Sequence, residues 1–416
     1  MDDYTKRTDE LMARINELAG YSEDQHVLTR TFGSPAFVEA SRKVVSWMKE
    51  AGLQTSVDNI GNIRGRLMAT NQPAKTFIIA SHIDSVVNAG KFDGPLGVVM
   101  GLDLVAQLAH QQLSPPFNIE LIAFSDEEGV RFHSTFLGSK VIAGTFEKDL
   151  LLKKDASGIF LQEVIQTIGG NPDRLSEDAI PSPELLGYFE IHIEQGPVLY
   201  EKNVPAAIVT GIAGQRRMEL TFKGIAGHAG TVPMDMRNDA LCAAAACIQE
   251  IENLAIAQKD KVVATVGKLD ILNAASNVIP GDVICSLDLR SADESILEAA
   301  SKDLKKICEA VCHKRSIDFK WNLIQSTKPV ACDKHFNDML QEAIEAAGYK
   351  TIKLVSGAGH DAVAIAAIAP VCMLFVRCFK GISHNPLENV EPGDIKASIK
   401  IAEKFLHTLI TQYNPS

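Results

Sequence analysis

Residues 76–128 read TFIIASHIDSVVNAGKFDGPLGVVMGLDLVAQLAHQQLSPPFNIELIAFSDEE and contain two apolar runs separated by a helical pattern. The runs 76–84 and 117–128 are rich in Ile, Phe and Leu, as buried strands are, whereas 98–110 carries apolar residues at the helical period. Strands that alternate with helices predict an α/β fold with a largely parallel sheet covered by helices. A helix over residues 35–52 is expected before this segment.

The middle of the chain has a different pattern, which begins near Gly211. The expected order is strand, helix, strand, strand, helix and strand, at residues 216–224, 238–255, 261–271, 281–291, 294–314 and 316–324. This order is that of a ferredoxin-like α+β unit. The helix and strand alternation then resumes with a helix at 334–347 and a strand at 371–377. We therefore expect a discontinuous domain of residues 1–210 and 327–416, with residues 211–326 inserted as a second domain.

Composition limits the classes of function. Of the 416 residues, 41 are basic and 52 acidic, and the net charge of −11 repels phosphate backbones and anionic lipids. We therefore expect no nucleic-acid partner and no membrane, and no apolar run approaches the roughly 20 residues that span a bilayer. All eight cysteines lie in the second half of the chain without a Cys-x-x-Cys pair, so we expect free thiols and a cytoplasmic protein.

Side chains that can bind metals follow the two strands of residues 76–128. His82 and Asp84 end the first strand, and because strand side chains repeat every two residues, Asp84 is expected to hydrogen-bond the second ring nitrogen of His82. Asp93 follows in the turn KFDGPLG, ahead of a helix. Two ordinary alternatives stay open, a structural strand-end histidine and a helix N-cap at Asp93.

Three consecutive acids, Asp126, Glu127 and Glu128, end the second strand. Because clustered carboxylates raise each other's pKa, such a group is costly without a compensating cation. Adjacent strand residues point to opposite sides, so we expect one of Glu127 and Glu128 to bind metal while the other holds a water. A solvated loop of acids is the alternative.

Two further histidines complete a candidate metal site. His192 alternates with Glu190 and Glu194 in GYFEIHIEQGPVL, and His384 lies in KGISHNP after a strand. In open α/β sheets ligands collect at the carboxyl ends of strands. Imidazole and carboxylate ligands without thiolate suit zinc, manganese, cobalt or nickel in a hydrolytic site, and one bridging carboxylate can hold two ions. The potential ligands are His82, Asp93, Glu128, His192 and His384.

Other catalytic classes are disfavoured. Glycine-rich segments such as SGAGHDA lack the P-loop lysine and the dinucleotide-binding glycine spacing. The chain also lacks a G-x-S-x-G elbow, which argues against a covalent serine route.

Nine ordered motifs carry a family resemblance. They are SHIDSV, FDGPLG, SDEEGVRF, HIEQGPVL, GQRR, GHAGTVPMDMR, NVIPG, SGAGHDA and GISHNP. From about residue 25 to its end, the chain resembles the amidase/carbamoylase branch of the dinuclear-zinc aminoacylase and carboxypeptidase superfamily. This branch contains N-carbamoyl-L-amino-acid hydrolases and allantoate amidohydrolases. The resemblance implies a metallopeptidase-like domain with an inserted lid and dimerisation domain.

The resemblance also implies roles for the candidate ligands. His82, Asp93, Glu128, His192 and His384 resemble the ligands of two divalent ions, with Asp93 shared by both. Zinc is the first expectation, and manganese, cobalt and nickel are alternatives. Glu127 resembles the general base. A histidine at position 192, where peptidase relatives are expected to carry an acid, is typical of the carbamoylase branch.

The inserted domain contributes further candidates. His228 in GHAGTVPMDMR resembles a histidine that reaches into the partner subunit's active site and polarises the scissile carbonyl. This implies a homodimer through residues 211–326. From spacing alone, a turn histidine is an equal reading.

Asn277 and Arg290 resemble the groups that hold the substrate carboxylate, a task that suits the planar fork of arginine. A surface Arg290 paired with Asp288 or Asp293 is the alternative. Further candidates for contacts to the ureido and carboxylate groups are Gln195, Gln215, Arg216 and His360.

We therefore expect a metal-dependent amidohydrolase. Its substrates would be small ureido acids, either N-carbamoyl-L-amino acids or relatives such as allantoate, and cleavage of the ureido C–N bond would release ammonia and carbon dioxide. An aminoacylase or dipeptidase that cleaves an amide is the main alternative. A metal-binding protein without catalysis is the other.

Overall fold

The computed structural model describes residues 2–111 and 115–413. The chain divides into two compact units, unit 1 (Met1–Thr210 with Cys332–Ser416) and unit 2 (Gly211–Ala331). The second unit begins at the residue where the sequence pattern changes. It ends at Ala331 rather than at residue 326, because the short strand β14 (Val330–Ala331) still pairs within this unit, with Gly211 and Ile212.

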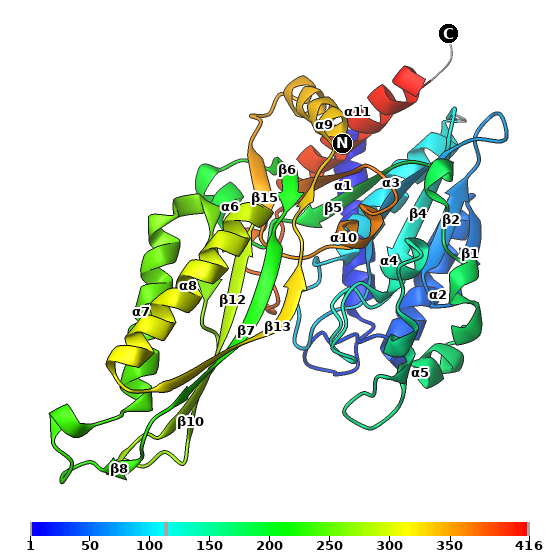
Figure 1. The fold of residues 1–416 in the computed structure, drawn as a ribbon. Helices are drawn as coiled ribbons and strands as arrows, with labels where there is room; N and C mark the ends of the chain where they lie inside the picture. The colour runs from blue at the N-terminus through cyan, green and yellow to red at the C-terminus, as the bar shows by residue number, and fades with distance from the viewer. Residues whose placement is uncertain (1, 112–114, 414–416) are drawn as a thin grey trace. The chain divides into compact units, whose positions relative to one another are not determined.

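Unit 1 is a sheet with helices on its faces (Figure 1). Its helices are α1 (Asp3–Ala19), α2 (Pro35–Glu50), α3 (Pro95–His110), α4 (Leu137–Ile142), α5 (Leu161–Thr167), α6 (Val198–Lys202), α9 (Lys334–Ala346), α10 (Ala362–Ile365) and α11 (Pro392–Tyr413), with 3-10 turns η1 (Lys148–Leu152), η2 (Pro172–Glu177), η3 (Ser182–Glu184) and η6 (Phe379–Gly381). Its strands are β1 (Gln54–Val57), β2 (Ile63–Leu67), β3 (Thr76–His82), β4 (Asn118–Phe124), β5 (Leu185–Ile193), β6 (Ala206–Ile212, which continues into unit 2), β15 (Lys353–Ser356) and β16 (Val371–Val376).

The sheet has the strand order β1-β2-β4-β3-β5-β16-β6-β14, and β15 also pairs with β6. The four strands β4, β3, β5 and β16 are parallel neighbours, as predicted. The strands β1, β2 and β6 run antiparallel to their neighbours, so the sheet as a whole is mixed. The parallel strands end at His82, Phe124, Ile193 and Val376, which brings the segments that follow them to one edge of the sheet.

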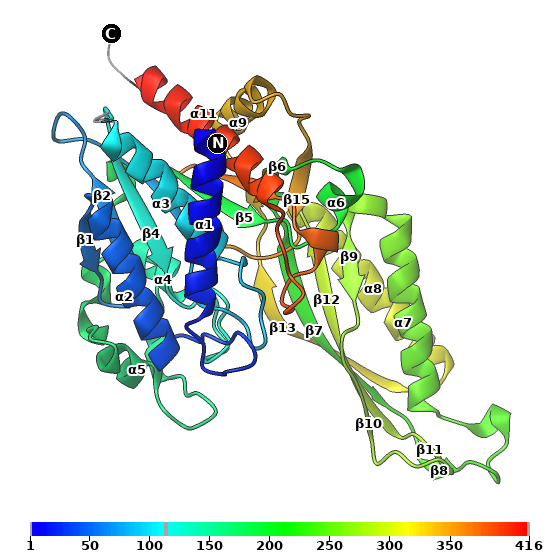
Figure 2. The same ribbon diagram turned by 180° about the vertical axis from the view of Figure 1, so that it is seen from behind.

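Helices cover both faces of this sheet. Every residue of β3 and β4 is buried, as expected for central parallel strands. Figure 1 shows α4, α5 and α10 on one side, and Figure 2, seen from behind, shows α1, α2 and α3 on the other. The expected helices at 35–52, 98–110 and 334–347 correspond to α2, α3 and α9. The α/β prediction is confirmed.

Unit 2 contains a second sheet with two long helices. Its elements are β7 (Gly214–Lys223), β8 (Gly227–His228), η4 (Met234–Met236), α7 (Ala240–Ala257), η5 (Lys259–Lys261), β9 (Val263–Thr265), β10 (Leu269–Leu272), β11 (Val278–Ile279), β12 (Asp282–Ser291), α8 (Glu294–Lys314), β13 (Asp318–Thr327) and β14. The antiparallel order is β10-β12-β7-β13, with β9 also on β12. Buried residues of α7 and α8 form one apolar core with β7 and β12.

One expected strand of unit 2 is wrong in detail. Residues 261–271 were expected as a single strand, but the structure has β9 and β10 separated by a segment that includes Gly267. Glycine weakens a strand interior because it has no side chain to pack. The two short strands still pair with the same neighbour, β12, so the order of elements is unchanged.

One helix passes a length and composition test for a membrane span. This helix, α7, is the only one that does so among the described residues. Such a test is also passed by core helices of globular domains. Ala240, Ala243, Cys247 and Ile251 of α7 are buried in the core of unit 2, which accounts for part of its apolar character.

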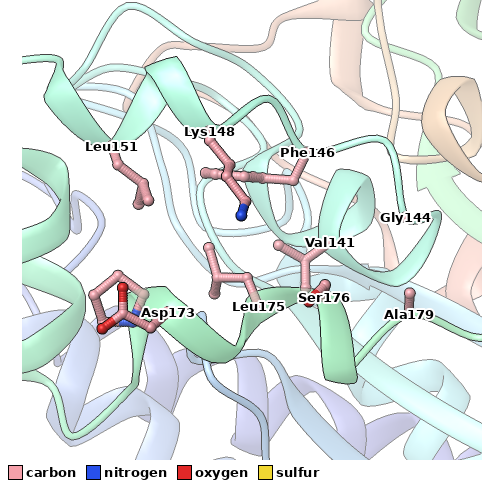
Figure 3. A pocket seen from close by; sticks show the side chains of 10 residues that line it. Val141, Gly144, Phe146, Lys148, Leu151, Asp173, Leu175, Ser176 and Ala179 are labelled. Atoms are coloured by element: carbon pink, nitrogen blue, oxygen red, sulfur yellow. The ribbon is translucent and has the colours of Figure 1, made fainter.

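Unit 1 also has a surface cavity of about 220 Å³ between α4, η1 and η2 (Figure 3). Its walls are mainly apolar, with Phe146, Leu151 and Leu175 facing the cavity, and the side chain of Lys148 also points into it. In the part of the chain that the structure describes, the lining residues include none of the candidate ligands. This cavity is therefore separate from the site described next.

Candidate metal centre and active site

His82 is the last residue of β3, and its ring lies against Gly94. A Cβ atom at position 94 would lie 2.5 Å from two atoms of the His82 ring, and Gly94 has a φ of 84°. Only glycine meets both conditions without strain. The glycine after Asp93 therefore lets the turn approach the histidine closely, which the motif KFDGPLG did not reveal by itself.

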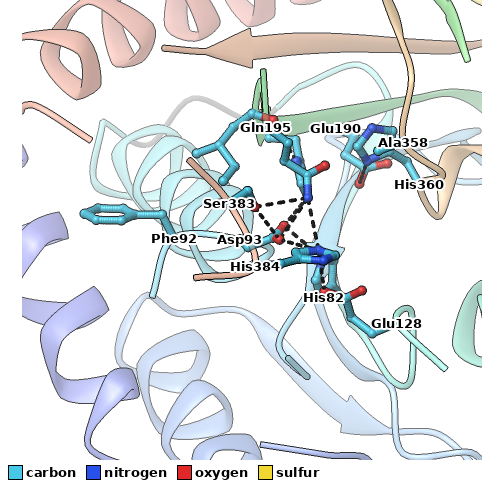
Figure 4. Close-up of polar contacts among 12 residues, drawn as sticks. His82, Phe92, Asp93, Glu128, Glu190, Gln195, Ala358, His360, Ser383 and His384 are labelled. Atoms are coloured by element: carbon cyan, nitrogen blue, oxygen red, sulfur yellow. Dashed lines mark hydrogen bonds and ion pairs between the residues drawn. The ribbon is translucent and has the colours of Figure 1, made fainter. Parts of the chain in front are cut away.

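Asp93 is not a helix cap. The N-cap of α3 is Gly94, and the helix begins at Pro95. The Asp93 side chain instead points into a group of histidines (Figure 4). Its Oδ1 atom lies 3.1 Å from His192 Nε2 and 3.9 Å from His82 Nε2, whereas its Oδ2 atom lies 3.1 Å from His384 Nε2. One oxygen of this carboxylate thus faces two imidazoles, and the other oxygen faces a third.

The five candidate ligands converge in unit 1. One group with ligand atoms within 4.8 Å of one another is His82, Asp93 and His192, and a second is Asp93, Glu128 and His384. His384 Nε2 lies 3.4 Å from Glu128 Oε1. Asp93 belongs to both groups, which is the arrangement expected of a carboxylate shared by two ions.

The spacing of these atoms fits divalent metals. Two nitrogen or oxygen ligands of one zinc ion, bound at about 2.0–2.1 Å in a tetrahedron, lie about 3.3 Å apart. The contacts between the candidate ligands range from 3.1 to 3.9 Å. The groups of possible metal ligands found among the described residues contain histidine and carboxylate without cysteine, so the donor set suits a hydrolytic metal centre.

Glu127 and Glu128 both reach this cluster. Together with His82 they form a third group with ligand atoms within 4.8 Å. We expected adjacent residues to point to opposite sides, and this is wrong because β4 ends at Phe124 and Asp126 has a φ of 53°, so strand alternation does not extend to position 127. Burial, together with the charge of Glu128, raises the pKa of Glu127 well above its ordinary value.

Asp84 makes different hydrogen bonds from those expected. The Nδ1 atom of His82 contacts the backbone carbonyl oxygen of Asp84 at 3.1 Å, whereas the Asp84 carboxylate lies 3.7 Å from it. The carboxylate accepts from the backbone N–H groups of Glu127 and Glu128, each at 3.1 Å. Since β3 ends at His82, Asp84 lies beyond the strand and is free to turn toward the neighbouring loop.

Gln195 joins the cluster from the loop after β5. It has a φ of 56°, and its Nε2 atom donates to Asp93 Oδ2 at 2.9 Å and lies 3.3 Å from His384 Nε2 (Figure 4). Ser383 donates to the same Asp93 oxygen at 3.0 Å. Ser383 was missed in the sequence analysis, where its position beside His384 was the only signal.

The ring of His360 packs against the ring of His192. The two rings are 4.6 Å apart in an edge-to-face arrangement, and His360 is 1% exposed. Its Nε2 atom is 2.7 Å from the Ser356 hydroxyl, and Glu190, fully buried, has an oxygen 4.0 Å from its Nδ1 atom. Burial raises the pKa of Glu190 to about 7. Among the substrate candidates, Gln195 and His360 therefore adjoin the candidate metal ligands.

The remaining candidates belong to unit 2. His228 and Asn277 lie on one two-stranded ribbon, since β8 pairs with β11 and the Ala229 N–H donates to the Asn277 carbonyl at 2.9 Å. The side chain of His228 is exposed, and its Nδ1 atom accepts from the Gly230 N–H at 3.1 Å. Two residues 49 positions apart in the sequence, 277 minus 228, are thus neighbours in space.

Three other candidates in unit 2 lie near acids. Arg290 binds Asp288 through its Nε atom at 2.8 Å and its Nη2 atom at 3.0 Å, and Gln215 donates to the same carboxylate. The ion pair left open as an alternative for Arg290 is therefore present. Arg216 lies 3.0 Å from Glu294.

Comparison with known proteins identifies the family. The family model "Peptidase family M20/M25/M40" matches residues 78–408. The chain is 40% identical to an N-carbamoyl-L-amino acid amidohydrolase of Geobacillus stearothermophilus, with 88% of each chain covered. It is 39% identical to allantoate deiminase 1 of Glycine max, with 96% of this chain and 89% of that protein covered.

A solved structure of a related protein supports the same family assignment. The crystal structure of an amidase of the hydantoinase/carbamoylase family from Burkholderia multivorans has a TM-score of 0.90 and 32% identity, and the match covers 96% of this chain and 97% of that one. The family model covers well over half of the chain, and both relatives exceed 30% identity over most of their length. The chain therefore belongs to the peptidase family M20/M25/M40.

Proposed function

We propose that this protein is a metal-dependent amidohydrolase that cleaves the ureido C–N bond of N-carbamoyl-L-amino acids or related ureido acids such as allantoate. The observation that carries the proposal is the cluster in which Asp93 faces His82 and His192 with one oxygen and His384 with the other, beside Glu127. The relatives named as N-carbamoyl-L-amino acid amidohydrolase and allantoate deiminase support the bond that is cleaved.

The proposed cofactor is a pair of divalent ions. One ion would be held by His82, Asp93 and His192, and the other by Asp93, Glu128 and His384. Zinc is our first choice because three of the contacts between these atoms, at 3.1 to 3.4 Å, are close to the separation of two ligands in tetrahedral zinc sites, and manganese, cobalt and nickel accept the same donors. When bound, the ions supply Lewis acidity that lowers the pKa of water and polarises the ureido carbonyl.

Glu127 is the proposed general base. Its carboxylate lies in the cluster and is buried, and burial together with the charge of Glu128 raises its pKa well above the ordinary value. A carboxylate positioned beside the reacting atoms can accept a proton and return it. Glu127 takes a proton from the attacking water as oxygen adds to the ureido carbon. It then gives this proton to the leaving nitrogen, so that the amine and a carbamate are released. The carbamate breaks down to ammonia and carbon dioxide.

Substrate contacts are proposed in both units. Gln195 and His360 of unit 1 would bind the ureido group beside the metal ligands. In unit 2, Asn277 and Arg290 would hold the substrate carboxylate, assisted by Gln215 and Arg216. Arg290 donates two hydrogen bonds to Asp288, which hold its planar guanidinium in a defined orientation. The proposed role of Arg290 in substrate binding is supported by the family resemblance and not by this pair, which a structural arginine would make as well.

His228 is proposed to act in a partner subunit. Its exposed side chain on the β8–β11 ribbon is suited to reach outward, and an imidazole N–H can stabilise the negative charge that develops on the carbonyl oxygen. The protein would then be a homodimer through unit 2, with each active site completed by the partner's His228.

Eight free cysteines, seven of them buried, are consistent with the cytoplasm as the proposed compartment.

A substrate panel tests the proposal. The protein is freed of metal, reconstituted separately with zinc, manganese, cobalt and nickel, and assayed for ammonia release from allantoate and from several N-carbamoyl-L-amino acids. N-acetyl amino acids and dipeptides are assayed in parallel by amine release. Turnover of the ureido acids supports the proposal. Turnover confined to acyl or peptide amides would assign an aminoacylase or dipeptidase, and no turnover with any metal would indicate a metal-binding protein without catalysis.

A further inference from the structure

Glu388 connects two distant segments of unit 1 that carry candidate metal ligands. It lies in the loop before α11, four residues after His384, and is 4% exposed. Its Oε1 atom accepts hydrogen bonds from the backbone N–H groups of Phe92 at 2.8 Å and Asp93 at 3.1 Å. A single buried carboxylate oxygen thus holds the backbone of the residue whose side chain faces all three histidines of the cluster.

The second oxygen of Glu388 reaches the Asp93 side chain through a hydroxyl. The Ser383 Oγ atom lies 3.1 Å from Glu388 Oε2 and 3.0 Å from Asp93 Oδ2. A serine hydroxyl has one hydrogen, so it can donate to only one of the two carboxylates at a time. Whichever carboxylate the hydroxyl bonds, the Asp93 N–H group still donates to Glu388, so the three residues form one group, of which Figure 4 shows Ser383 and Asp93.

The turn before Asp93 is shaped to receive Glu388. A Cβ atom at position 90 would lie 2.2 Å from Glu388 Cδ and 2.3 Å from its Oε1 atom. Only glycine leaves room for the carboxylate at this place. Both the backbone of the 90–93 turn and the loop of residues 383–388 are therefore fitted to this one contact.

We propose that Glu388 is a positioning residue for the metal centre, which holds Asp93 and the loop of His384 in the mutual geometry needed to bind two ions. The inference rests on the proposed function only in assuming that Asp93 and His384 bind metal. Glu388 acts through the Asp93 backbone and Ser383 and is not itself one of the candidate ligands.

Loss of the Glu388 carboxylate should disturb the turn that carries Asp93, because this carboxylate accepts two backbone hydrogen bonds of the turn. Without it, the N–H groups of Phe92 and Asp93 lose their acceptor in a buried place, and the turn must shift to find another. A shift of Asp93 changes its distances to His192 and His384 together. Mutation of residues that orient metal ligands in this way commonly lowers metal affinity by about 10- to 100-fold.

The test measures metal affinity and metal-free stability separately. Zinc binding by the full-length E388A, E388Q and S383A variants is titrated against a chromophoric chelator, and thermal unfolding is recorded without metal. We expect E388A to weaken binding of at least one of the two ions by about 10-fold or more. E388Q keeps an acceptor oxygen for the two N–H groups, so we expect it to lose zinc affinity as well, but less than E388A.

A matched control separates positioning from general destabilisation. Asp333 also accepts a backbone N–H, that of Phe336 at 2.9 Å at the start of α9, and it lies outside the cluster. D333A should lower the unfolding temperature without metal while zinc affinity stays as in the wild type.

If E388A binds both zinc ions as tightly as the wild type does, the proposal is overturned, whatever the stability of the variant. If E388A does not fold, unchanged affinity in E388Q overturns it. Failure of the wild type to bind any ion would instead contradict the proposed metal centre.

Discussion

The side chain of Asp84 holds the backbone of Glu127: its Oδ1 atom accepts a hydrogen bond from the Glu127 N–H group at 3.1 Å. Its other oxygen accepts in the same way from the Glu128 N–H group. One buried carboxylate thus orients the proposed base and a proposed ligand, while its own backbone carbonyl contacts the His82 ring. The segment after β3 and the segment after β4 are joined by these bonds at the edge of the sheet.

Replacing Asp84 by Asn should impair catalysis. An amide has one oxygen, so its NH2 group would face one of the two N–H donors, and the backbone of Glu127 or Glu128 would move. We expect kcat/KM on the best ureido substrate to fall by about 10- to 100-fold at saturating metal. D24N is a matched control, since Asp24 accepts the His26 and Val27 N–H groups at 2.7 and 3.3 Å in an exposed loop. Equal activities of the two variants would contradict this role of Asp84.

Glu127 should be needed for turnover but not for metal. The E127Q side chain has nearly the same shape but cannot take a proton from water, so we expect turnover to fall by a factor of about 10² to 10⁴ or more. Metal content, measured by elemental analysis after dialysis, should remain that of the wild type. Activity that persists in E127Q would remove Glu127 from the role of base.

Two inactive variants should restore activity when they are mixed, if His228 acts in the partner subunit. A hybrid dimer of H228A and E127Q has one site with an intact Glu127 and the partner's intact His228. Random exchange of equal amounts should therefore recover about a quarter of wild-type activity. Each variant alone is the control and should stay inactive. No recovery after demonstrated subunit exchange would indicate that His228 acts within its own subunit or not at all.

Removal of metal should abolish activity and lower stability without unfolding the protein. The cluster holds the carboxylates of Asp93, Glu127 and Glu128 close together, and a bound cation offsets their repulsion. Each ion that is present at about 100 times its dissociation constant adds about 2.7 kcal/mol to the free energy of unfolding. Unfolding curves with chelator and with added zinc measure the difference. Full activity after exhaustive chelation, with metal absent by elemental analysis, would contradict the metal requirement.

Asp58 should make stability depend on pH. Burial raises its pKa in the folded chain to about 7, above the ordinary value of 3.8 that applies when it is unfolded. The protonated form is therefore favoured by folding, and this contribution to stability is full below pH 3.8 and is lost as the pH rises through about 7. Asp58 lies outside the metal cluster and accepts from the Ile60 and Asn62 N–H groups.

The difference in unfolding free energy between wild type and D58N isolates this group. The wild type should lose stability relative to D58N as the pH rises from 4 to 7, by at most about 1.4 kcal/mol per pH unit. Above about pH 8 the difference should stay constant. Denaturant unfolding of both proteins at a series of pH values measures it. A difference that does not vary with pH would mean that the Asp58 pKa is unshifted.

Local sequence patterns were sufficient for the order of elements and for the candidate ligands. The apolar runs that became β3 and β4 and the helical repeat that became α3 are short-range features, because side-chain periodicity depends on residues a few positions apart. His82, His192 and His384 could be selected because each lies at or just after the end of an expected strand. The carboxyl ends of parallel strands share one edge, and this rule was enough to bring them together.

Only the tertiary structure decided which atoms meet. The Asp84 carboxylate was expected to hydrogen-bond the ring of His82. It instead accepts hydrogen bonds from the backbone N–H groups of Glu127 and Glu128, because the strand ends at His82. The contact between Glu388 and Asp93 joins residues 295 positions apart, and no local pattern encodes such a partnership. Hydrogen bonds of this kind depend on the packing of whole segments at the angstrom scale, whereas periodicity records only which face of an element is apolar.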